Sequence, residues 1–308
     1  MHIEDSNVVV TGGAGFIGSH LVERLTRVND VVVVDDESSG RREWVPEDAN
    51  YVHGDLTDAG TAATAITAET DLVFHLAASK LVDTDTPRRQ FEDNSEMTYN
   101  VLERMADVGV EKLVFTSSST VYGEAPRPTP EDFAPLEPIS VYGATKLAEE
   151  ALVSTDAHSY GLQSWVFRFA NIVGPRLRGA VIPDFVEKLR ENPDRLTILG
   201  DGRQQKSYMH VSECVEAMLY AVENAEEAHN VFNLGTRTTT SVDRIADIVA
   251  EEMGVDPDYE YTGGDRGWTG DVPRMRLSIE KLAALGWEPS DSSDDAVRRA
   301  TRALLREL

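Results

Sequence analysis

The sequence predicts an α/β fold in which a doubly wound parallel sheet is joined to a second, smaller α/β lobe. Three observations predict it: apolar runs alternate with helical patterns, a glycine-rich turn joins the first run to the first helix, and the pattern changes after about residue 172. Continuous Val-rich runs are typical of strands buried on both faces of a sheet. Their alternation with helices indicates parallel strands.

Six runs in the first half of the chain are expected to form strands. They are NVVVTG from residue 7, DVVVVDD from 30, NYVHGDL from 50, DLVFHLAA from 71, EKLVFTSSS from 111 and SWVFRFAN from 164. The segments between them, such as GSHLVERLTRV and TPRRQFEDNSEMTYNVLERMADVG, have the spacing of amphipathic helices. A later helix and strand, HVSECVEAMLYAVEN and VFNLG, are expected to return to the sheet.

The second lobe is expected to be built from two pieces of chain. It begins with Gly- and Pro-marked segments, VGPRLRGAVIP and ILGDGRQQKS. We therefore expect one domain from 1–172 plus about 206–238, and a lobe from 173–205 plus about 239–308.

The composition excludes several classes of partner. Fifty-four acidic residues against 29 basic ones give a net charge of −25. Such a surface repels nucleic acid and anionic lipid, so we expect no nucleic-acid or membrane partner. No apolar run approaches the roughly 20 residues of a membrane span, and the first residues lack the pattern of a secretory signal. We expect a soluble cytoplasmic protein.

The acidic residues are spread along apparent helix faces. This distribution favours adaptation to high salt, because at molar salt the Debye length falls to about 3 Å and charge repulsion is screened. The alternative is an acidic protein with no such adaptation. The single cysteine, Cys214, cannot form an internal disulfide. No His or Cys spacing indicates a metal site, and His75 is interpreted as a packing residue at the end of a core strand.

A glycine-rich turn follows the first predicted strand. Gly12, Gly15 and Gly18 fall three residues apart, and Gly13 offers a second frame of the same pattern. Glycine reaches positive φ without steric cost, lets the backbone approach a pyrophosphate, and lets helix and strand pack closely. The positive end of the following helix attracts phosphate. Because the turn lies between a strand and a helix, it predicts a dinucleotide site of the Rossmann type.

An acidic residue ends the second predicted strand. Asp35 lies twenty-three residues after Gly12. A carboxylate there can accept both ribose hydroxyls of an adenosine and repels a 2′-phosphate, so NAD is favoured over NADP. Arg41 and Arg42 leave NADP open, since an arginine can accommodate that phosphate. Asp55 ends the third strand, where the adenine is expected, or alternatively caps a helix.

Tyr142 and Lys146 lie four residues apart in a predicted helix that follows the strand ending FTSSSTVYG. One helical turn places both side chains on one face. A phenol has a pKa of about 10, and lowering it by about 3 units takes roughly 4 kcal/mol of stabilisation of the phenolate. An ammonium beside it and an oxidised nicotinamide could supply that energy. Tyr142 would then remove a hydroxyl proton while hydride leaves the same carbon, Lys146 would also bind the nicotinamide ribose, and a serine of SSST would bond the substrate oxygen.

These motifs together resemble the extended short-chain dehydrogenase/reductase family, specifically its NAD-dependent nucleotide-sugar epimerases. The resemblance runs nearly end to end. It is carried by TGGAGFIGSHLVERL, HLAA, FTSSSTVYG, YGATK, RFANIVGPR, GDGRQQKSYMHV, FNLGT and LGWEP. It implies NAD as the cofactor, a nucleotide-sugar substrate with a UDP-sugar favoured, and a homodimer formed by the helices that contain TPRRQFEDNSEM and YGATKLAEE.

The resemblance also implies roles for individual residues. The catalytic set is Ser118, Tyr142 and Lys146. The residues expected at the cofactor are Gly12, Gly15, Phe16, Ile17, Gly18, Asp35, Asp36, Asp55, Leu56, Leu76, Ala77, Ala78, Lys80, Asn94, Tyr142, Lys146 and Phe169. The residues expected at the substrate are Lys80, Ser118, Ser119, Thr120, Tyr142, Asn171, Val181, Lys206 and Arg266.

Two of these positions depart from the family pattern. Lys206 stands where relatives often carry an arginine, and a lysine keeps the charge but loses the bidentate fork suited to phosphate. Arg266 comes slightly earlier than the phosphate-binding arginine of many relatives, so it is either a substrate ligand or a surface residue.

The residues after Ser118 discriminate among the reactions of the superfamily. Sugar 4,6-dehydratases carry an Asp-Glu pair there and sugar decarboxylases a glutamate, whereas this chain has Ser119, Thr120 and Val121. We therefore favour 4-epimerisation of UDP-glucose and UDP-galactose. The alternatives are an epimerase of UDP-GlcNAc or UDP-glucuronate, a nucleotide-sugar reductase or dehydrogenase, and a non-catalytic NAD sensor. The sugar is expected to be selected by residues 81–85, 120–124 and 171–183.

Overall fold

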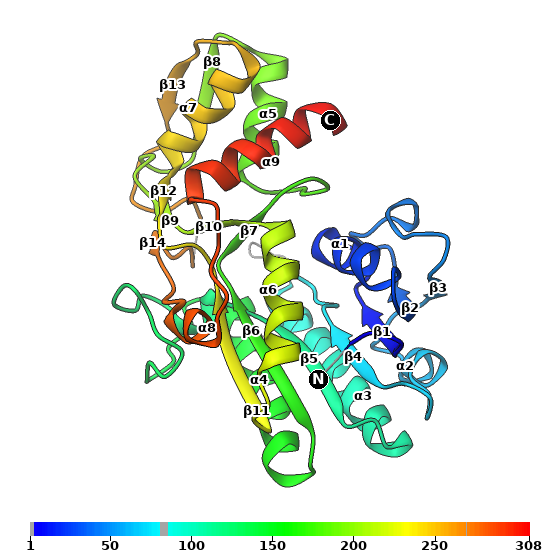
Figure 1. The fold of residues 1–308 in the computed structure, drawn as a ribbon. Coiled ribbons are helices and arrows are strands. Elements are labelled where there is room, and N and C mark those ends of the chain that lie inside the picture. Colours follow the sequence, from blue (N-terminus) through cyan, green and yellow to red (C-terminus); the bar gives the residue numbers. More distant parts are fainter. Residues whose placement is uncertain (1–2, 81–85, 269) are drawn as a thin grey trace. The chain divides into compact units, whose positions relative to one another are not determined.

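The runs predicted as strands lie in one seven-stranded sheet, in the order β11-β6-β5-β4-β1-β2-β3 (Figure 1). The strands are β1 (Asn7–Thr11), β2 (Asp30–Asp35), β3 (Asn50–His53), β4 (Leu72–His75), β5 (Lys112–Ser118), β6 (Gln163–Phe169) and β11 (His229–Leu234). β1 pairs in parallel with both β2 and β4, so that Val9 lies beside Val32 and Val73. The predicted doubly wound parallel sheet is therefore confirmed.

This computed structural model describes residues 3–80, 86–268 and 270–308. The chain forms two compact units. The first comprises Met1–Val121, Val141–Arg168 and Met218–Phe232, and the second comprises Tyr122–Ser140, Phe169–Ala217 and Asn233–Leu308. The predicted domains, which were defined by the ligand that each would bind, remain a prediction.

Helices of the first unit pack against the sheet. They are α1 (Phe16–Leu25), α2 (Ala59–Ala65), α3 (Pro87–Val108) and α4 (Val141–Ser159), with 3₁₀ turns η1 (Arg42–Trp44) and η2 (Ser119–Tyr122). α3 begins with Pro87 in its first turn and ends at Gly109, whose φ of 78° suits a left-handed cap. α3 and α4 pack on each other. Their apolar faces join the strands in one core that includes Val9, Val73, Val101, Met105, Leu113, Phe115, Val153 and Val166.

The second unit combines helices with short strands. Its elements are β7 (Asn171–Val173), α5 (Val181–Glu191), β8 (Arg195–Ile198), β9 (Gln205–Lys206), β10 (Tyr208–His210), β12 (Thr240–Ser241), α7 (Val242–Met253), β13 (Asp258–Tyr261), β14 (Arg274–Met275), α8 (Glu280–Leu285) and α9 (Ser293–Glu307). α6 (Val211–Asn224) begins in this unit and ends in the first. The strands form three small sheets, β10-β7, β12-β9-β14 and β13-β8.

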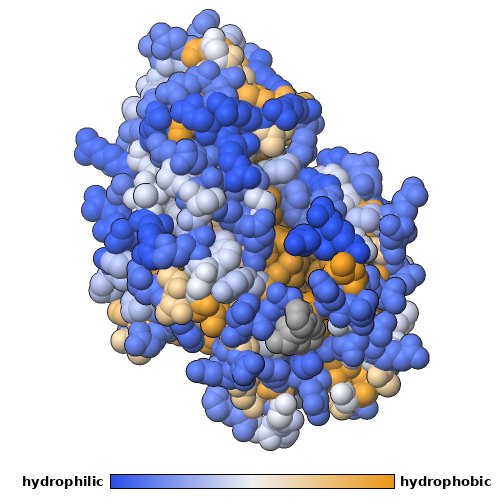
Figure 2. Space-filling model, in the orientation of Figure 1, coloured by the Kyte–Doolittle hydropathy of each residue, from blue (hydrophilic) through white to orange (hydrophobic). Residues whose placement is uncertain are grey.

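Hydrophilic residues cover most of the face shown in Figure 2, as the net charge of −25 requires. Within the three described ranges, no helix combines the length and apolar character that crossing a membrane demands.

Candidate active site

The glycine turn has the geometry that the sequence predicted. Gly12 has a φ of 66°, and a Cβ there would lie 2.7 Å from the backbone nitrogen of Ala77 after β4. A Cβ on Gly18 would lie 2.1 Å from the carbonyl oxygen of Gly12. Neither position has room for a side chain, so the first glycine serves the turn and the third serves the close approach of α1 to β1.

The start of α1 is left open for an anion. Gly15 is the N-cap of this helix and provides no side-chain cap, while Phe16 and Ile17 form its first turn. Within the described part of the chain, a Cβ on Gly15 would meet one atom inside 4 Å, the carbonyl oxygen of Gly12 at 3.2 Å. The helix end therefore offers backbone N–H groups, a positive dipole and open space, which is what a pyrophosphate needs.

Asp35 at the end of β2 is held by two backbone N–H groups. Its Oδ2 accepts from Ala14 at 2.9 Å and its Oδ1 from Glu37 at 2.8 Å. Burial raises the pKa of Asp35, and these two bonds oppose that shift. Each carboxylate oxygen keeps a lone pair for a ribose hydroxyl. The bonds orient the carboxylate beside the glycine turn.

The two arginines that left NADP open are engaged elsewhere. The guanidinium of Arg42 lies 4.7 Å from the ring centroid of Tyr51, and its Nη1 donates to the carbonyl of Val45 at 3.1 Å. Arg41 pairs with Glu43 at 3.2 Å. These contacts favour the unphosphorylated dinucleotide.

Further predicted cofactor residues follow β2 and β3. Asp36 and Asp55 are exposed, and Leu56 is buried. The alternative that Asp55 caps the next helix is wrong, because the N-cap of α2 is Asp58, whose side chain accepts the N–H of Gly60. Asp55 instead stays in the loop that leads from β3 to α2.

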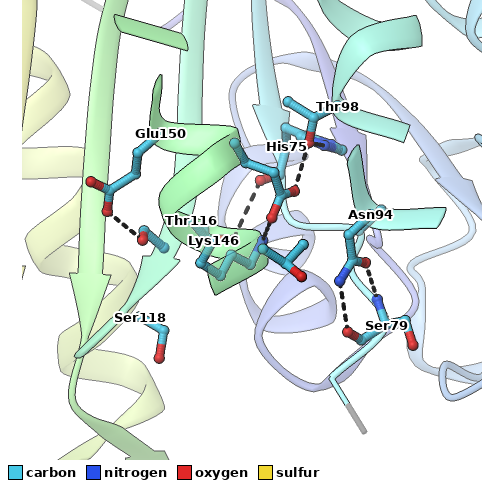
Figure 3. Close-up of polar contacts among 12 residues, drawn as sticks. His75, Ser79, Asn94, Thr98, Thr116, Ser118, Lys146 and Glu150 are labelled. Carbon is cyan, nitrogen blue, oxygen red and sulfur yellow. Dashed lines mark hydrogen bonds and ion pairs between the residues drawn. The ribbon is translucent and has the colours of Figure 1, made fainter. Parts of the chain in front are cut away.

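The segment after β4 contains the predicted residues Leu76, Ala77, Ala78 and Lys80. Asn94 of α3 holds the backbone of this segment, since its Nδ2 donates to the carbonyl of Ser79 at 2.9 Å and its Oδ1 accepts the N–H of Ser79 at 2.7 Å. Figure 3 shows both hydrogen bonds. Lys80 is exposed and Asn94 is fully buried. Asn94 therefore acts on the backbone of this segment. Residues 81–85, expected to help select the sugar, lie outside the described residues.

Ser118 ends β5 with its own proton available. Its Oγ accepts the N–H of Thr120 at 3.2 Å and the hydroxyl of Thr120 at 3.0 Å. Because a serine oxygen has two lone pairs and one hydrogen, Ser118 can still donate. Ser119 and Thr120 lie in η2 and are partly buried. The hydroxyl of Ser118 is thus left able to donate one hydrogen bond.

Tyr142 and Lys146 lie one turn apart at the start of α4, as predicted. Lys146 is 2% exposed, and its ammonium lies 4.7 Å from the ring centroid of Phe115. The sequence led us to expect a lowered pKa at Tyr142. In the structure, burial first and then the negative charge of Glu149 raise the pKa of Tyr142. Both effects oppose the lowered pKa that the sequence led us to expect.

Glu149 was missed by the sequence reasoning. It is completely buried, and its Oε2 lies 3.3 Å from the Nζ of Lys146. Its Oε1 accepts the hydroxyl of Thr98 at 2.6 Å. The Oγ1 of Thr98 in turn lies 3.0 Å from the Nε2 of His75. Figure 3 shows these two side chains next to each other. No periodicity in the sequence links α3, α4 and β4, so no pattern could have indicated these contacts.

Glu150, the next residue of α4, belongs to a separate buried pair. It accepts from Nη2 of Arg168 at 2.7 Å and from the hydroxyl of Ser117 at 2.5 Å. Two adjacent carboxylates of one helix thus have different partners.

In the second unit, Lys206 and Arg266 converge on a residue that the sequence reasoning missed. Asp271 is 3% exposed and pairs with the ammonium of Lys206 at 2.5 Å. Arg266 donates from Nη1 to the carbonyl of Asp271 at 2.5 Å, and its Nη2 pairs with Glu124. The ammonium of Lys206 lies 4.9 Å from the ring centroid of Trp268. Arg266 is therefore part of an ordered cluster, although its predicted role at the substrate stays a prediction.

The remaining predicted substrate and cofactor residues also lie in the second unit. Asn171 of β7 donates from Nδ2 to the carbonyl of Ser207 at 3.4 Å. Val181 opens α5 and is partly buried, and Phe169 at the end of β6 is 9% exposed. Their roles stay predictions.

Comparison with known proteins gives this arrangement a family context. Residues 8–235 match the model of the NAD dependent epimerase/dehydratase family. A crystal structure of a UDP-galactose 4-epimerase is similar, with a TM-score of 0.89, 44% identity, and coverage of 98% of this chain and 99% of that one. The structure of the UDP-glucose 4-epimerase of Thermotoga maritima with UDP-glucose has a TM-score of 0.89 and 32% identity, and the match covers 98% of this chain and 99% of that one. The structure of the UDP-glucose 4-epimerase of Thermus thermophilus in complex with NAD has a TM-score of 0.88 and 33% identity, and the match covers 98% of this chain and 100% of that one.

Proposed function

Since the chain belongs to the NAD dependent epimerase/dehydratase family, we propose that it interconverts UDP-glucose and UDP-galactose at C4 of the sugar. It is an NAD-dependent epimerase, an isomerase, of the nucleotide-sugar 4-epimerase family. The identity of the sugar pair and the role of each residue are what we propose.

The observation that carries the proposal is the burial and incomplete hydrogen bonding of the ammonium of Lys146. Its ammonium is buried and ion-paired, yet in the described part of the chain it makes no hydrogen bond of good geometry. A buried ammonium whose N–H groups are not aligned with acceptors is costly, even beside a carboxylate, which indicates that a ligand completes the site. The two hydroxyls of a nicotinamide ribose are acceptors that fit it.

Other residues of the first unit fit the rest of NAD. The open start of α1 at Gly15 would hold the pyrophosphate, and Asp35 would accept the adenosine ribose hydroxyls. When bound, NAD supplies reversible hydride transfer at one carbon of the sugar. It also brings a positive charge, which would oppose the effects that raise the pKa of Tyr142.

Side chains of the first unit would carry out the proton transfers. Tyr142 would take the proton of the sugar 4-hydroxyl as C4 loses its hydride, and would return that proton when the hydride comes back to the opposite face. Ser118 would donate its free hydrogen to the O4 atom throughout. Neither step requires a carboxylate beside Ser118, and Ser119 and Thr120 provide none. This absence favours epimerisation over dehydration.

We propose that the second unit binds the nucleotide part of the substrate. Lys206 and Arg266 would face the diphosphate, as the resemblance implies, and would turn to it from their present partners, the carboxylate of Asp271 for Lys206 and the carbonyl of Asp271 and Glu124 for Arg266. Asn171 and Val181 would contact the diphosphate and the region of the base. The similar structures are of UDP-galactose and UDP-glucose 4-epimerases, which supports a UDP-sugar, and one of them contains UDP-glucose.

A homodimer through α3 and α4 is part of the proposal. Two aromatic side chains of α3 support it, since Phe91 is 39% exposed and Tyr99 is 54% exposed. Apolar rings on a helix surface favour burial against a second copy.

The test is to incubate the protein with UDP-, dTDP- and GDP-sugars and to separate the products by chromatography. We expect UDP-glucose and UDP-galactose to interconvert with no net change in the absorbance of reduced nicotinamide. Stoichiometric reduction of NAD would instead show a dehydrogenase. Conversion confined to UDP-GlcNAc or UDP-glucuronate would move the assignment to that sugar, and no conversion of any sugar would leave an NAD-binding protein without catalysis.

A further inference from the structure

We propose that Glu149 is a positioning residue that fixes the ammonium of Lys146 and offsets its charge beside Tyr142. This deepens the proposed function and rests on it, because it takes Lys146 and Tyr142 to be the catalytic pair. The contacts of Glu149 carry it, together with the buried chain of hydrogen bonds that ends on its carboxylate.

One oxygen of the Glu149 carboxylate is hydrogen-bonded, and the other is ion-paired. Oε2 lies 3.3 Å from the Nζ of Lys146, and Oε1 accepts the hydroxyl of Thr98 at 2.6 Å. Glu149 is 0% exposed and Lys146 is 2% exposed. With water excluded, the charge of this carboxylate acts on its neighbours with little screening.

The number of hydrogens and lone pairs on each side chain fixes the direction of the other hydrogen bonds in this series. Thr98 gives its only hydroxyl hydrogen to Glu149, so it must accept from Nε2 of His75 at 3.0 Å. Burial and the charge of Lys146 lower the pKa of His75 to about 3, so the ring is neutral and its Nδ1 is an acceptor. Nδ1 therefore accepts the hydroxyl of Thr11 at 2.7 Å.

The far end of this chain lies where the dinucleotide-binding segments meet. The Oγ1 of Thr11, at the end of β1, accepts the N–H groups of Leu76 and Ala77 at 3.2 Å each. Every hydrogen in the series thus points toward Glu149. Aligned bonds of this kind polarise one another and restrict the position of the carboxylate. The orientation of Lys146 is in this way tied to the glycine turn, whose Gly12 approaches Ala77.

In the part of the chain that the structure describes, the charged and titratable groups around Glu149 come from three elements. Lys146, Tyr142 and Glu150 belong to its own helix, His75 comes from β4, and Arg168 of β6 is ion-paired with Glu150. Burial and, least, the charge of Glu150 raise the pKa of Glu149, whereas Lys146 and Thr98 oppose that shift. The ion pair with Lys146 favours the charged carboxylate, and this carboxylate is the negative group that acts on the Tyr142 phenol.

The negative charge of Glu149 affects both proton transfers that an epimerase requires of Tyr142. Tyr142 must remove a proton in one half of the reaction and return it in the other. A proton carrier works best when its pKa is near the working pH in both directions. The ammonium of Lys146, one helical turn away, and oxidised NAD would both favour the phenolate, and an unopposed pair of cations would make Tyr142 a poor acid. The negative charge of Glu149 opposes these cations and keeps the pKa of Tyr142 high enough for the phenol to return its proton.

The test is Glu149→Gln, which keeps the shape of the side chain and an acceptor for Thr98 but removes the charge. Loss of the negative group favours the phenolate, so the pKa of Tyr142 falls. We expect the acid limb of the kcat/KM profile to move to lower pH by about one unit. Without NAD, tyrosinate difference absorbance should show one tyrosine that ionises at lower pH than in the wild type, and this signal should be missing in Glu149→Gln combined with Tyr142→Phe.

Glu150→Gln is the matched control, because it removes a buried carboxylate charge one residue further along the same helix. It should lower thermal stability and leave the acid limb in place. If Glu149→Gln does not fold, Thr98→Val serves instead. It raises the pKa of Glu149 by removing a hydrogen bond and should shift the limb in the same direction by a smaller amount.

An acid limb that stays in place or moves to higher pH in Glu149→Gln overturns the inference, as does an equal shift in Glu150→Gln. The proposed function fails separately, when the wild-type protein converts no nucleotide sugar or when Tyr142→Phe remains active.

Discussion

Replacing Gly18 with alanine tests how the first unit forms its dinucleotide site. The added Cβ would lie 2.1 Å from the carbonyl oxygen of Gly12 and 2.8 Å from the Cα of Gly13. Both neighbours are backbone atoms, and carbon–oxygen contacts normally begin at about 3.3 Å. The start of α1 and the glycine turn must therefore separate by about 1 Å.

The expected magnitude follows from this displacement. Overpacking of this kind costs about 1–3 kcal/mol, and the better helix propensity of alanine returns up to about 1 kcal/mol. We expect Gly18→Ala to lose about 1 kcal/mol in the free energy of unfolding, the difference between these two terms. Because the moved atoms include the N–H groups offered to the pyrophosphate, NAD affinity should fall at least about tenfold, which is about 1.4 kcal/mol.

The assay is thermal unfolding together with titration of NAD by fluorescence or calorimetry. Gly60→Ala is the matched control, because Gly60 lies in α2, is exposed, and its added Cβ would contact only the flexible side chain of Asp58 at 3.2 Å. It should be neutral or stabilising and leave NAD affinity unchanged. Wild-type stability and affinity in Gly18→Ala would refute the reasoning from close backbone approach.

Two further predictions concern charge. Asp35→Asn should weaken NAD binding at least about tenfold and cost about 1–3 kcal/mol of stability, because one of the N–H groups of Ala14 and Glu37 loses its acceptor; unchanged NAD titrations and melting curves would count against the ribose contact. The free energy of unfolding should rise between 0.1 M and molar KCl, since the Debye length falls from about 10 to 3 Å and screens a net charge of −25. A stability independent of salt in urea titrations would contradict adaptation to high salt.

The parallel sheet was predictable because its strands carry local signals. Val31 to Val34 form a run that is hydrophobic on both faces, and the glycine spacing marks where the first strand passes into a helix. The small sheets of the second unit carry no such signal. β9, β12 and β14 are two residues long, and their pairing depends on tertiary contacts.

The candidate site was predictable only where chemistry and spacing coincide within one element. Tyr142 and Lys146 share a helix, so their spacing could be read from the sequence. The contacts of Glu149 with Thr98, and of Asp271 with Lys206, join residues 51 and 65 positions apart. His75 was interpreted as a packing residue, yet its ring makes two hydrogen bonds in the same buried chain. Burial was predictable for this residue, and its partners were not.

Tyr142→Phe tests the central claim most directly. The variant removes one oxygen atom from α4 and leaves the glycine turn, Asp35 and Lys146 in place. The measurement is the rate of conversion of UDP-galactose to UDP-glucose, followed by chromatography on protein whose NAD content is determined in parallel. We predict a loss of at least about 100-fold in rate, the lower range for general acid–base catalysis, with NAD still bound. A variant that converts the sugar at the wild-type rate would contradict the account.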